Sequence, residues 1–207
     1  MRLYLASTSP ARLATLRAAG VEPVLLSSGV DEEAVAAAAA PLTGPELVLL
    51  LARCKAEAVI GPTIDGFVLG GDSAFELDGG IFGKPRHPEV ARSRWNAMRG
   101  HTGLLHSGHW LIDHRSGVSG AAVGGVSTAA VTFAADITDA ELDAYVATGE
   151  PLQVAGAFTI DSLGAAFIER VEGDPHAVVG LSVSLLRSLA GQLGVAWPEF
   201  WNRSSQL

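Results

Sequence analysis

Segments with strand character and segments with helix character are interleaved along this 207-residue chain. Short apolar runs predict the strands, while capping residues, early prolines and terminal glycines mark most of the helices. The two kinds follow each other without a strict strand–helix–strand rhythm, so we expect an α/β fold with a mixed β-sheet and flanking helices. The predicted strands are 3–6, 23–26, 67–71, 74–77, 81–82, 104–113, 123–133 and 165–171, and the predicted helices are 10–19, 45–60, 88–99, 138–148 and 182–193.

Composition narrows the class of protein. With 48% hydrophobic residues, a chain of this length can bury a real core, as one domain or two small lobes. We expect a single domain over residues 1–195 and an aromatic tail at 196–207. The net charge of -8 argues against a nucleic-acid partner, which needs clustered Lys and Arg. Because no apolar run has the ~18 residues of a membrane span and no signal peptide is evident, we expect a cytoplasmic protein without a membrane partner.

Only two of the 14 basic residues are lysines, Lys55 and Lys84. Retaining a compact ammonium in an arginine-rich chain favours a specific task, such as binding a phosphate oxygen, although compositional drift is the alternative. On the helix predicted at 45–60, Lys55 lies on the apolar side with Leu51 and Val59. An inward-facing charge needs a partner, unless the side chain extends to the helix edge and reaches solvent.

The segment from Ser7 to Arg12 joins a predicted strand to a predicted helix. Ser9 is a suitable N-cap and Pro10 suits the first turn. Backbone N–H groups, the positive end of the helix dipole and the Arg12 guanidinium together suit an anion. A cation in the first turn is otherwise unfavourable, so Arg12 indicates an anionic partner. The alternative is ordinary capping by Ser9 with a solvated Arg12.

Asp72 follows an apolar run and is predicted to end that strand, where α/β proteins place ligands. The turn at 78–80 folds the chain back, so we expect Lys84 near Ser73 or Ala74 and in one site with Asp72. A carboxylate there can hold Mg²⁺ or accept a proton from water. The alternative is a salt bridge from Asp72 to Lys84 without chemistry.

A second candidate carboxylate, Glu32, follows the second predicted strand, where a solvated acidic turn is the alternative. His106 and His109 are three apart in a predicted strand and face opposite sides, which is poor geometry for one metal ion. The residues alone therefore predict an anion site, a carboxylate and a divalent metal. This combination points to phosphate-ester or nucleotide chemistry.

Taken together, the motifs resemble those of the Maf family of nucleoside triphosphate pyrophosphatases. They occur in the family's order over nearly the whole chain, so the series is far more specific than any single motif. The matching pieces are Leu5-Ala6-Ser7-Thr8-Ser9-Pro10-Ala11-Arg12, Val30-Asp31-Glu32, Ala52-Arg53-Cys54-Lys55-Ala56, Gly71-Asp72-Ser73, Gly83-Lys84-Pro85, Gly149-Glu150-Pro151, Ala155-Gly156-Ala157-Phe158, Phe167-Ile168-Glu169, Glu172-Gly173-Asp174 and Val179-Gly180-Leu181.

The resemblance implies an elongated, two-lobed fold with a central cleft, similar to inosine triphosphate pyrophosphatase, and a homodimer. It implies hydrolysis of a nucleoside triphosphate to the monophosphate and pyrophosphate with a divalent cation, Mg²⁺ or Mn²⁺. By position, Asp72 would be the catalytic base, and Glu32 and Asp72 would bind the metal. The residues implied to bind substrate are Ser7, Ser9, Arg12, Lys55 and Lys84, and those implied to set base specificity are Arg12, Ser73 and Asp161.

The chain also departs from the family pattern. Gln153 and Val154 stand where many members have Asp-Lys, Phe158 replaces a Tyr, and Asp161 stands where the uridine- and thymidine-triphosphate group commonly has Gln. The sequence therefore predicts no particular nucleobase. Two alternatives to the pyrophosphatase are a non-catalytic nucleotide-binding regulator of septum formation and cell division, and a phosphatase that releases orthophosphate.

Overall fold

The computed structural model describes residues 1–118 and 120–202, which form two compact units. The first unit comprises Met1–Asp72, Ser107–Ser127 and the chain from Gly180 onward. The second comprises Ser73–His106 and Thr128–Val179. Within the described ranges, none of the helices combines the length and apolar character that crossing a membrane requires.

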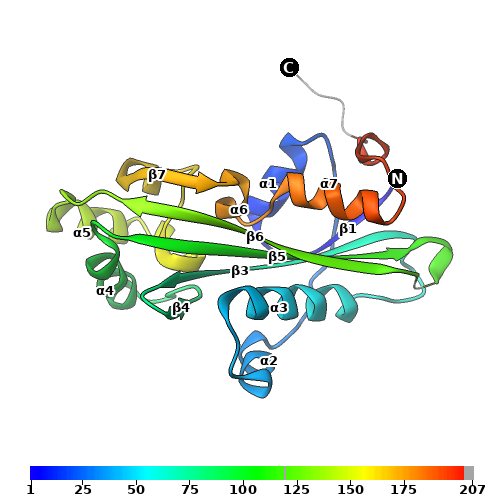
Figure 1. Ribbon diagram of the computed structural model, residues 1–207, viewed down its shortest axis with the longest axis horizontal. Coiled ribbons are helices and arrows are strands. Elements are labelled where there is room, and N and C mark those ends of the chain that lie inside the picture. Colours follow the sequence, from blue (N-terminus) through cyan, green and yellow to red (C-terminus); the bar gives the residue numbers. More distant parts are fainter. Residues whose placement is uncertain (119, 203–207) are drawn as a thin grey trace. The chain divides into compact units, whose positions relative to one another are not determined.

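Helices and strands are interleaved, as the sequence predicts (Figure 1). The strands are β1 (Leu3–Ala6), β2 (Val24–Leu25), β3 (Gly66–Leu77), β4 (Gly80–Phe82), β5 (Thr102–His114), β6 (Ala122–Phe133) and β7 (Ile168–Gly173). The α-helices are α1 (Pro10–Ala18), α2 (Glu32–Ala39), α3 (Gly44–Ala58), α4 (Pro88–Met98), α5 (Asp139–Ala147), α6 (Pro175–Val179) and α7 (Val183–Gln192). Short 3-10 helices are η1 (Arg115–Gly117), η2 (Glu150–Gln153), η3 (Ala155–Ala157), η4 (Leu163–Phe167) and η5 (Trp197–Phe200).

In the described part of the chain, seven strands form one mixed sheet in the order β2-β1-β3-β5-β6-β7, with β4 paired to β3. β1 is parallel to both β2 and β3, whereas β3–β4 and β6–β7 are antiparallel pairs. The α/β fold with a mixed sheet and flanking helices is thus confirmed. The predicted turn at 78–80 is also confirmed, since Asp78 and Gly79 both have positive φ and connect β3 to β4.

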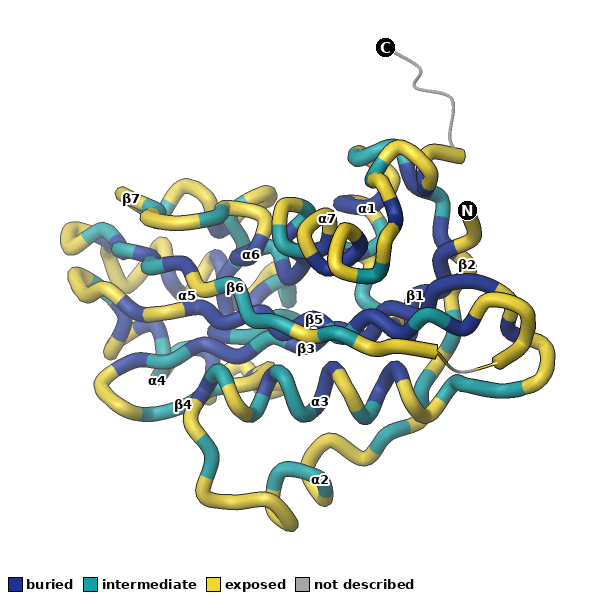
Figure 2. Tube along the Cα trace, turned by 45° about the vertical axis from the view of Figure 1, so that its right-hand side comes forward, coloured by how far each residue is buried: buried dark blue, intermediate teal, exposed yellow. Residues whose placement is uncertain are grey.

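The first unit buries both faces of its central strands. Along β1, Leu3 and Leu5 belong to the apolar cluster that contains residues of α1 and α7, whereas Tyr4 and Ala6 belong to the cluster that contains Ala56 of α3. This alternation follows from the two-residue period of a strand. Figure 1 shows α3 on one face and α1 and α7 on the other, and Figure 2 shows buried residues recurring along α3.

The second unit has a core of aromatic rings. Trp95 of α4 is fully buried, and its indole N–H donates a hydrogen bond of 2.8 Å to the carbonyl oxygen of Ala157. Phe133 and Tyr145 meet the Trp95 ring edge-on, at centroid distances of 5.4 and 5.6 Å. Edge-to-face contacts of this kind stabilise a core beyond the burial of apolar area.

Two of the predicted boundaries that were wrong concern candidate site residues. β3 does not end before Asp72 but continues through it to Leu77, so Asp72 lies inside a strand of 12 residues. β3 continues past Asp72 because residues 75–77 pair with β4. Glu32 does not lie in a turn; it is the first residue of α2, whose N-cap, Asp31, accepts a hydrogen bond from the Ala34 N–H.

The aromatic tail begins as η5 and belongs to the first unit. Phe200 is buried and packs edge-on against Phe67 of β3, with ring centroids 5.4 Å apart. Trp201 remains 57% exposed. The end of the predicted tail, 203–207, lies outside the described residues.

Candidate functional site

Close packing of α3 against β3 brings the first pair of candidate residues together. A Cβ on Gly70 would lie 1.9 Å from the carbonyl oxygen of Ala52, so only glycine fits there. Asp72 lies two residues further along the strand and therefore on the same face. Lys55 follows Ala52 by almost one turn of α3. The sequence thus places the ammonium and the carboxylate at one contact between helix and strand.

The Lys55 ammonium bridges two carboxylates. Its Nζ lies 2.6 Å from Asp72 Oδ1 and 2.6 Å from Glu32 Oε1. The Lys55 and Asp72 side chains are only 9% and 11% exposed, whereas the Glu32 side chain is 51% exposed. The expectation that Lys55 faces inward is confirmed, and its ammonium has a buried partner rather than reaching bulk solvent.

Arg12 approaches β3 from the opposite face. Gly71 points away from α3, and a Cβ there would lie 3.2 Å from Arg12 Nε. Inside the first unit, Arg12 Nη1 donates a hydrogen bond of 3.1 Å to Ser7 Oγ, and Arg12 Nε donates one of 2.8 Å to the carbonyl oxygen of Gly180. Ser9 is the N-cap of α1, as predicted, and its side chain accepts from the Arg12 backbone N–H at 3.4 Å.

Two cations and two carboxylates therefore meet at β3. Burial raises the pKa of the Asp72 carboxyl above its ordinary value, and Glu32 adds to the rise, while Lys55 and Arg12 oppose it. Burial also lowers the pKa of the Arg12 guanidinium, against the influence of Asp72 and Glu32. A carboxylate with a raised pKa accepts a proton more readily than an exposed aspartate, so Asp72 is suited to act as a base.

The donor set fits a hard divalent cation whose ligands are only partly supplied by protein. Glu32 and Asp72 offer carboxylate oxygens, and both contact one Lys55 nitrogen, so these oxygens lie no further apart than twice that contact. Among the residues described, no group of three or more His, Cys, Asp or Glu side chains could hold a metal ion. Mg²⁺ is commonly bound by one or two carboxylates together with water and substrate phosphates.

Three predicted site residues belong to the second unit. Ser73 is half-buried, whereas Lys84 and Asp161 are exposed. The β3–β4 ladder ends at the pair Phe75–Phe82, two residues before Lys84. The site that Lys84 is predicted to share with Asp72, and the roles of Ser73, Lys84 and Asp161 toward a substrate, stay predictions.

Glu150 fixes the segment that carries Asp161. Its carboxylate accepts hydrogen bonds from the hydroxyls of Thr159, Ser162 and Tyr145, at 2.5, 2.7 and 3.0 Å, and from the Gly164 N–H at 3.1 Å. Burial raises the pKa of Glu150, but these hydrogen bonds outweigh it and lower the pKa to about 2. No role was predicted for this carboxylate beyond its place in the Gly149-Glu150-Pro151 motif.

Two residues near Arg12, Gly180 and His109, were not predicted to belong to the site. Gly180, which accepts from Arg12 Nε, lies 168 residues away in the chain. His109 is buried and contacts the nearby Ser182. No local pattern links such distant positions; the only sequence signal was the motif around Gly180.

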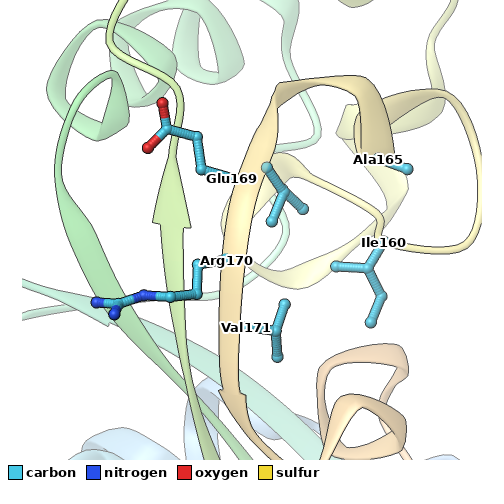
Figure 3. A pocket seen from close by; sticks show the side chains of 6 residues that line it. Ile160, Ala165, Glu169, Arg170 and Val171 are labelled. Carbon is cyan, nitrogen blue, oxygen red and sulfur yellow. The ribbon is translucent and has the colours of Figure 1, made fainter.

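A shallow hollow of about 280 Å³ lies in the second unit (Figure 3). Figure 3 shows Ile160 and Val171 facing each other across it, while the Arg170 guanidinium points away. Its lining contains none of the predicted substrate-binding residues. The charged cluster at β3 therefore offers the stronger chemical site.

Comparison with known proteins identifies the family. Residues 2–193 match the family model described as Maf-like protein. A nucleoside triphosphate pyrophosphatase of Leifsonia xyli is 66% identical, over 99% of this chain and 98% of the relative. Proteins of the same name from Salinispora tropica and Nocardia farcinica are 52% and 48% identical, over 99% of this chain and 89% and 98% of the relatives. The family predicted from the motifs is confirmed: this chain belongs to the Maf family.

Proposed function

We propose that this chain is a nucleoside triphosphate pyrophosphatase, a hydrolase that converts a nucleoside triphosphate to the monophosphate and pyrophosphate. The observation that carries the proposal is the buried Asp72 carboxylate beside the Lys55 ammonium, with Arg12 on the other face of the same strand. Attack of water on a phosphorus atom requires a base that accepts the proton and cations that stabilise the phosphate charge, and this site offers one base and two cations. The name shared by the relatives supports the same activity.

The cations and helix start are proposed to bind the phosphate chain. Arg12 and the N-terminus of α1, capped by Ser9, offer directed N–H donors and a positive dipole end. Ser7 holds the guanidinium in place. Lys55 adds a point charge from the side of α3, and its ammonium stabilises the negative charge that develops on the phosphate oxygens.

Asp72 is proposed to accept the proton of the attacking water. The water oxygen forms a bond to the α-phosphorus, its proton passes to an Asp72 carboxylate oxygen, and the bond from the α-phosphorus to the bridging oxygen breaks. Pyrophosphate leaves with that electron pair. The raised pKa of Asp72 favours this proton transfer over what an ordinary aspartate offers.

Glu32 and Asp72 are the residues proposed to hold Mg²⁺ or Mn²⁺. When bound, such a cation neutralises phosphate charge and lowers the pKa of a bound water. Lys84 as a further phosphate ligand, and Arg12, Ser73 and Asp161 as determinants of the base, remain proposals from the family resemblance. The two-lobed arrangement with a central cleft, the homodimer and the cytoplasmic location likewise remain predictions.

The test is a panel of purified nucleoside triphosphates with Mg²⁺ or Mn²⁺, in which pyrophosphate and orthophosphate are assayed separately. We expect pyrophosphate and monophosphate as the first products. Orthophosphate as the first product would favour a phosphatase, and absence of turnover on every base would favour the non-catalytic regulator. Asp72→Asn is expected to lower kcat by a factor on the order of 100 or more, with unchanged circular dichroism. Full activity of this variant would remove Asp72 from the role of base.

A further inference from the structure

The Arg12 guanidinium is held by the chain segment that leads into α7. Arg12 Nε donates to the carbonyl oxygen of Gly180 at 2.8 Å, in a buried contact. Gly180 has a φ of 109°, a conformation that side-chain-bearing residues rarely adopt, so its carbonyl direction depends on a locally fixed backbone. Two residues later, Ser182 caps α7, and its Oγ accepts from the Leu185 N–H at 3.1 Å.

His109 of β5 fixes this same segment. Its side chain is buried, and its Nε2 accepts a hydrogen bond of 3.0 Å from the backbone N–H of Ser182. Its Nδ1 lies 3.1 Å from the carbonyl oxygen of Ser107, which can only accept. These two partners assign the proton to Nδ1 and leave Nε2 as an acceptor, so the imidazole is neutral. The Ser182 backbone is therefore tied to the sheet by one specific ring nitrogen.

We propose that His109 is a positioning residue for phosphate binding: by holding the Ser182 backbone it sets the Gly180 carbonyl, which in turn aims the Arg12 guanidinium. This inference rests on the proposed function, in which Arg12 binds the triphosphate. All of these groups belong to the first unit. The ring does not touch the phosphate; it acts through two backbone groups. Without His109 Nε2, the buried Ser182 N–H would lose its acceptor, which is costly enough to shift the backbone around Ser182. The direction of the Gly180 carbonyl would change with that shift.

Two polar substitutions of His109 distinguish the loss of the hydrogen-bond acceptor from the loss of side-chain volume. Gln at position 109 places an oxygen near the position of the lost Nε2, whereas the shorter Asn can replace only Nδ1. We expect His109→Asn to raise KM for the nucleoside triphosphate about tenfold with kcat changed less than about threefold, because the interaction is present in both the ground and transition states. His109→Gln is expected to restore KM to within about threefold of wild type.

A double-variant cycle tests the route through Arg12. If His109 acts by aiming the guanidinium, His109→Asn adds no further rise in KM to that of Arg12→Met. Leu111→Ala on the same strand is the control for lost stability, since Leu111 is fully buried in the apolar cluster of this unit. It is expected to lower Tm without changing KM.

Binding of inorganic tripolyphosphate, measured by calorimetry, distinguishes failure of this inference from failure of the proposed function. Wild-type protein that binds tripolyphosphate without hydrolysing any nucleotide would refute the enzyme, while an about tenfold weaker affinity of His109→Asn would still support the positioning role. Equal affinity of the Asn variant and wild type would overturn the role of His109. If the rise in KM of the double variant equals the product of the rises caused by His109→Asn and Arg12→Met alone, the route through Arg12 is overturned.

Discussion

Lys55→Met isolates the energetic role of the buried ammonium. The substitution keeps the length and apolar stem of the side chain and removes the charge that bridges Asp72 and Glu32. It leaves the Asp72 carboxylate, which is 11% exposed, without its closest cation. Arg12 still acts on Asp72 from the other face of β3, so the carboxylate is not wholly uncompensated.

The expected loss of stability follows from which of the two contacts is buried. Removing one member of a buried ion pair costs about 3–5 kcal/mol, and Arg12 places the expected value at the lower end, about 3 kcal/mol near pH 8. The contact with Glu32 contributes about 0–1 kcal/mol, because the Glu32 side chain is 51% exposed and solvent screens the pair. Loss of the Asp72 contact therefore dominates the free energy of unfolding.

The loss depends on pH in a defined direction. Burial already raises the pKa of Asp72 above 3.8, and loss of the ammonium raises it further. A carboxyl with a higher pKa in the folded state favours folding below its unfolded pKa, and this advantage disappears as the pH rises through the folded pKa. The deficit of Lys55→Met thus grows with pH, by about 1.4 kcal/mol per pH unit between the Asp72 pKa values of the two proteins.

Urea unfolding followed by tryptophan fluorescence, repeated at a series of pH values, measures this deficit. Arg53→Met on the exposed face of α3 is the matched control, since its pair with Glu57 is 2.8 Å long but 55% and 49% exposed; solvent screens this pair, so its loss is expected to change stability far less than Lys55→Met does. Lys55→Met combined with Asp72→Asn is expected to recover to within about 1 kcal/mol of wild type. A double variant as unstable as Lys55→Met alone would refute the reasoning, because the buried carboxylate would then not be the cause.

Two further predictions concern the second unit. Glu150→Gln is expected to lose about 1–3 kcal/mol near pH 7, because an amide nitrogen replaces one acceptor oxygen facing hydroxyl and N–H donors. Since the pKa of Glu150 is lowered from 4.5 to about 2, the stability that its carboxylate contributes is present above pH 4.5 and is lost as the pH falls toward 2. Urea unfolding measures the difference between Glu150→Gln and wild type, and a difference that does not narrow below pH 4.5 would contradict this. Lys84→Arg is expected to lower kcat/KM about tenfold despite the conserved charge, and an unchanged value would undercut the preference for a point charge.

Local sequence signals predicted most of the fold because they act over a few residues. Ser9 and Thr138 cap α1 and α5 as their positions indicated, and the glycine-rich turn at 78–80 joins β3 to β4. The errors arose where tertiary pairing overrides local pattern. The strand predicted at 67–71 ends at Gly71, but β3 continues through both glycines; a Cβ on Gly70 would lie 1.9 Å from the Ala52 carbonyl oxygen, and one on Gly71 would lie 3.2 Å from Arg12 Nε.

The site was predictable only in part. Helical periodicity was enough to turn Lys55 inward, because an amphipathic helix must bury its apolar face. The partner of Lys55 was not predictable from periodicity, which gives the direction of a side chain and not the residue that it meets. Contacts such as Arg12 with Gly180 join positions 168 residues apart, so no local pattern contains them.

The arrangement around Asp72 depends on the two glycines that precede it. A strand presents successive residues to opposite faces, so Gly70 and Gly71 leave one gap on each side of β3. α3 occupies the first gap, which brings Lys55 to Asp72, and the Arg12 side chain occupies the second. One strand thereby receives a cation from each face at neighbouring residues. The Gly-Gly-Asp sequence consequently specifies the spacing of charges as well as the position of the carboxylate.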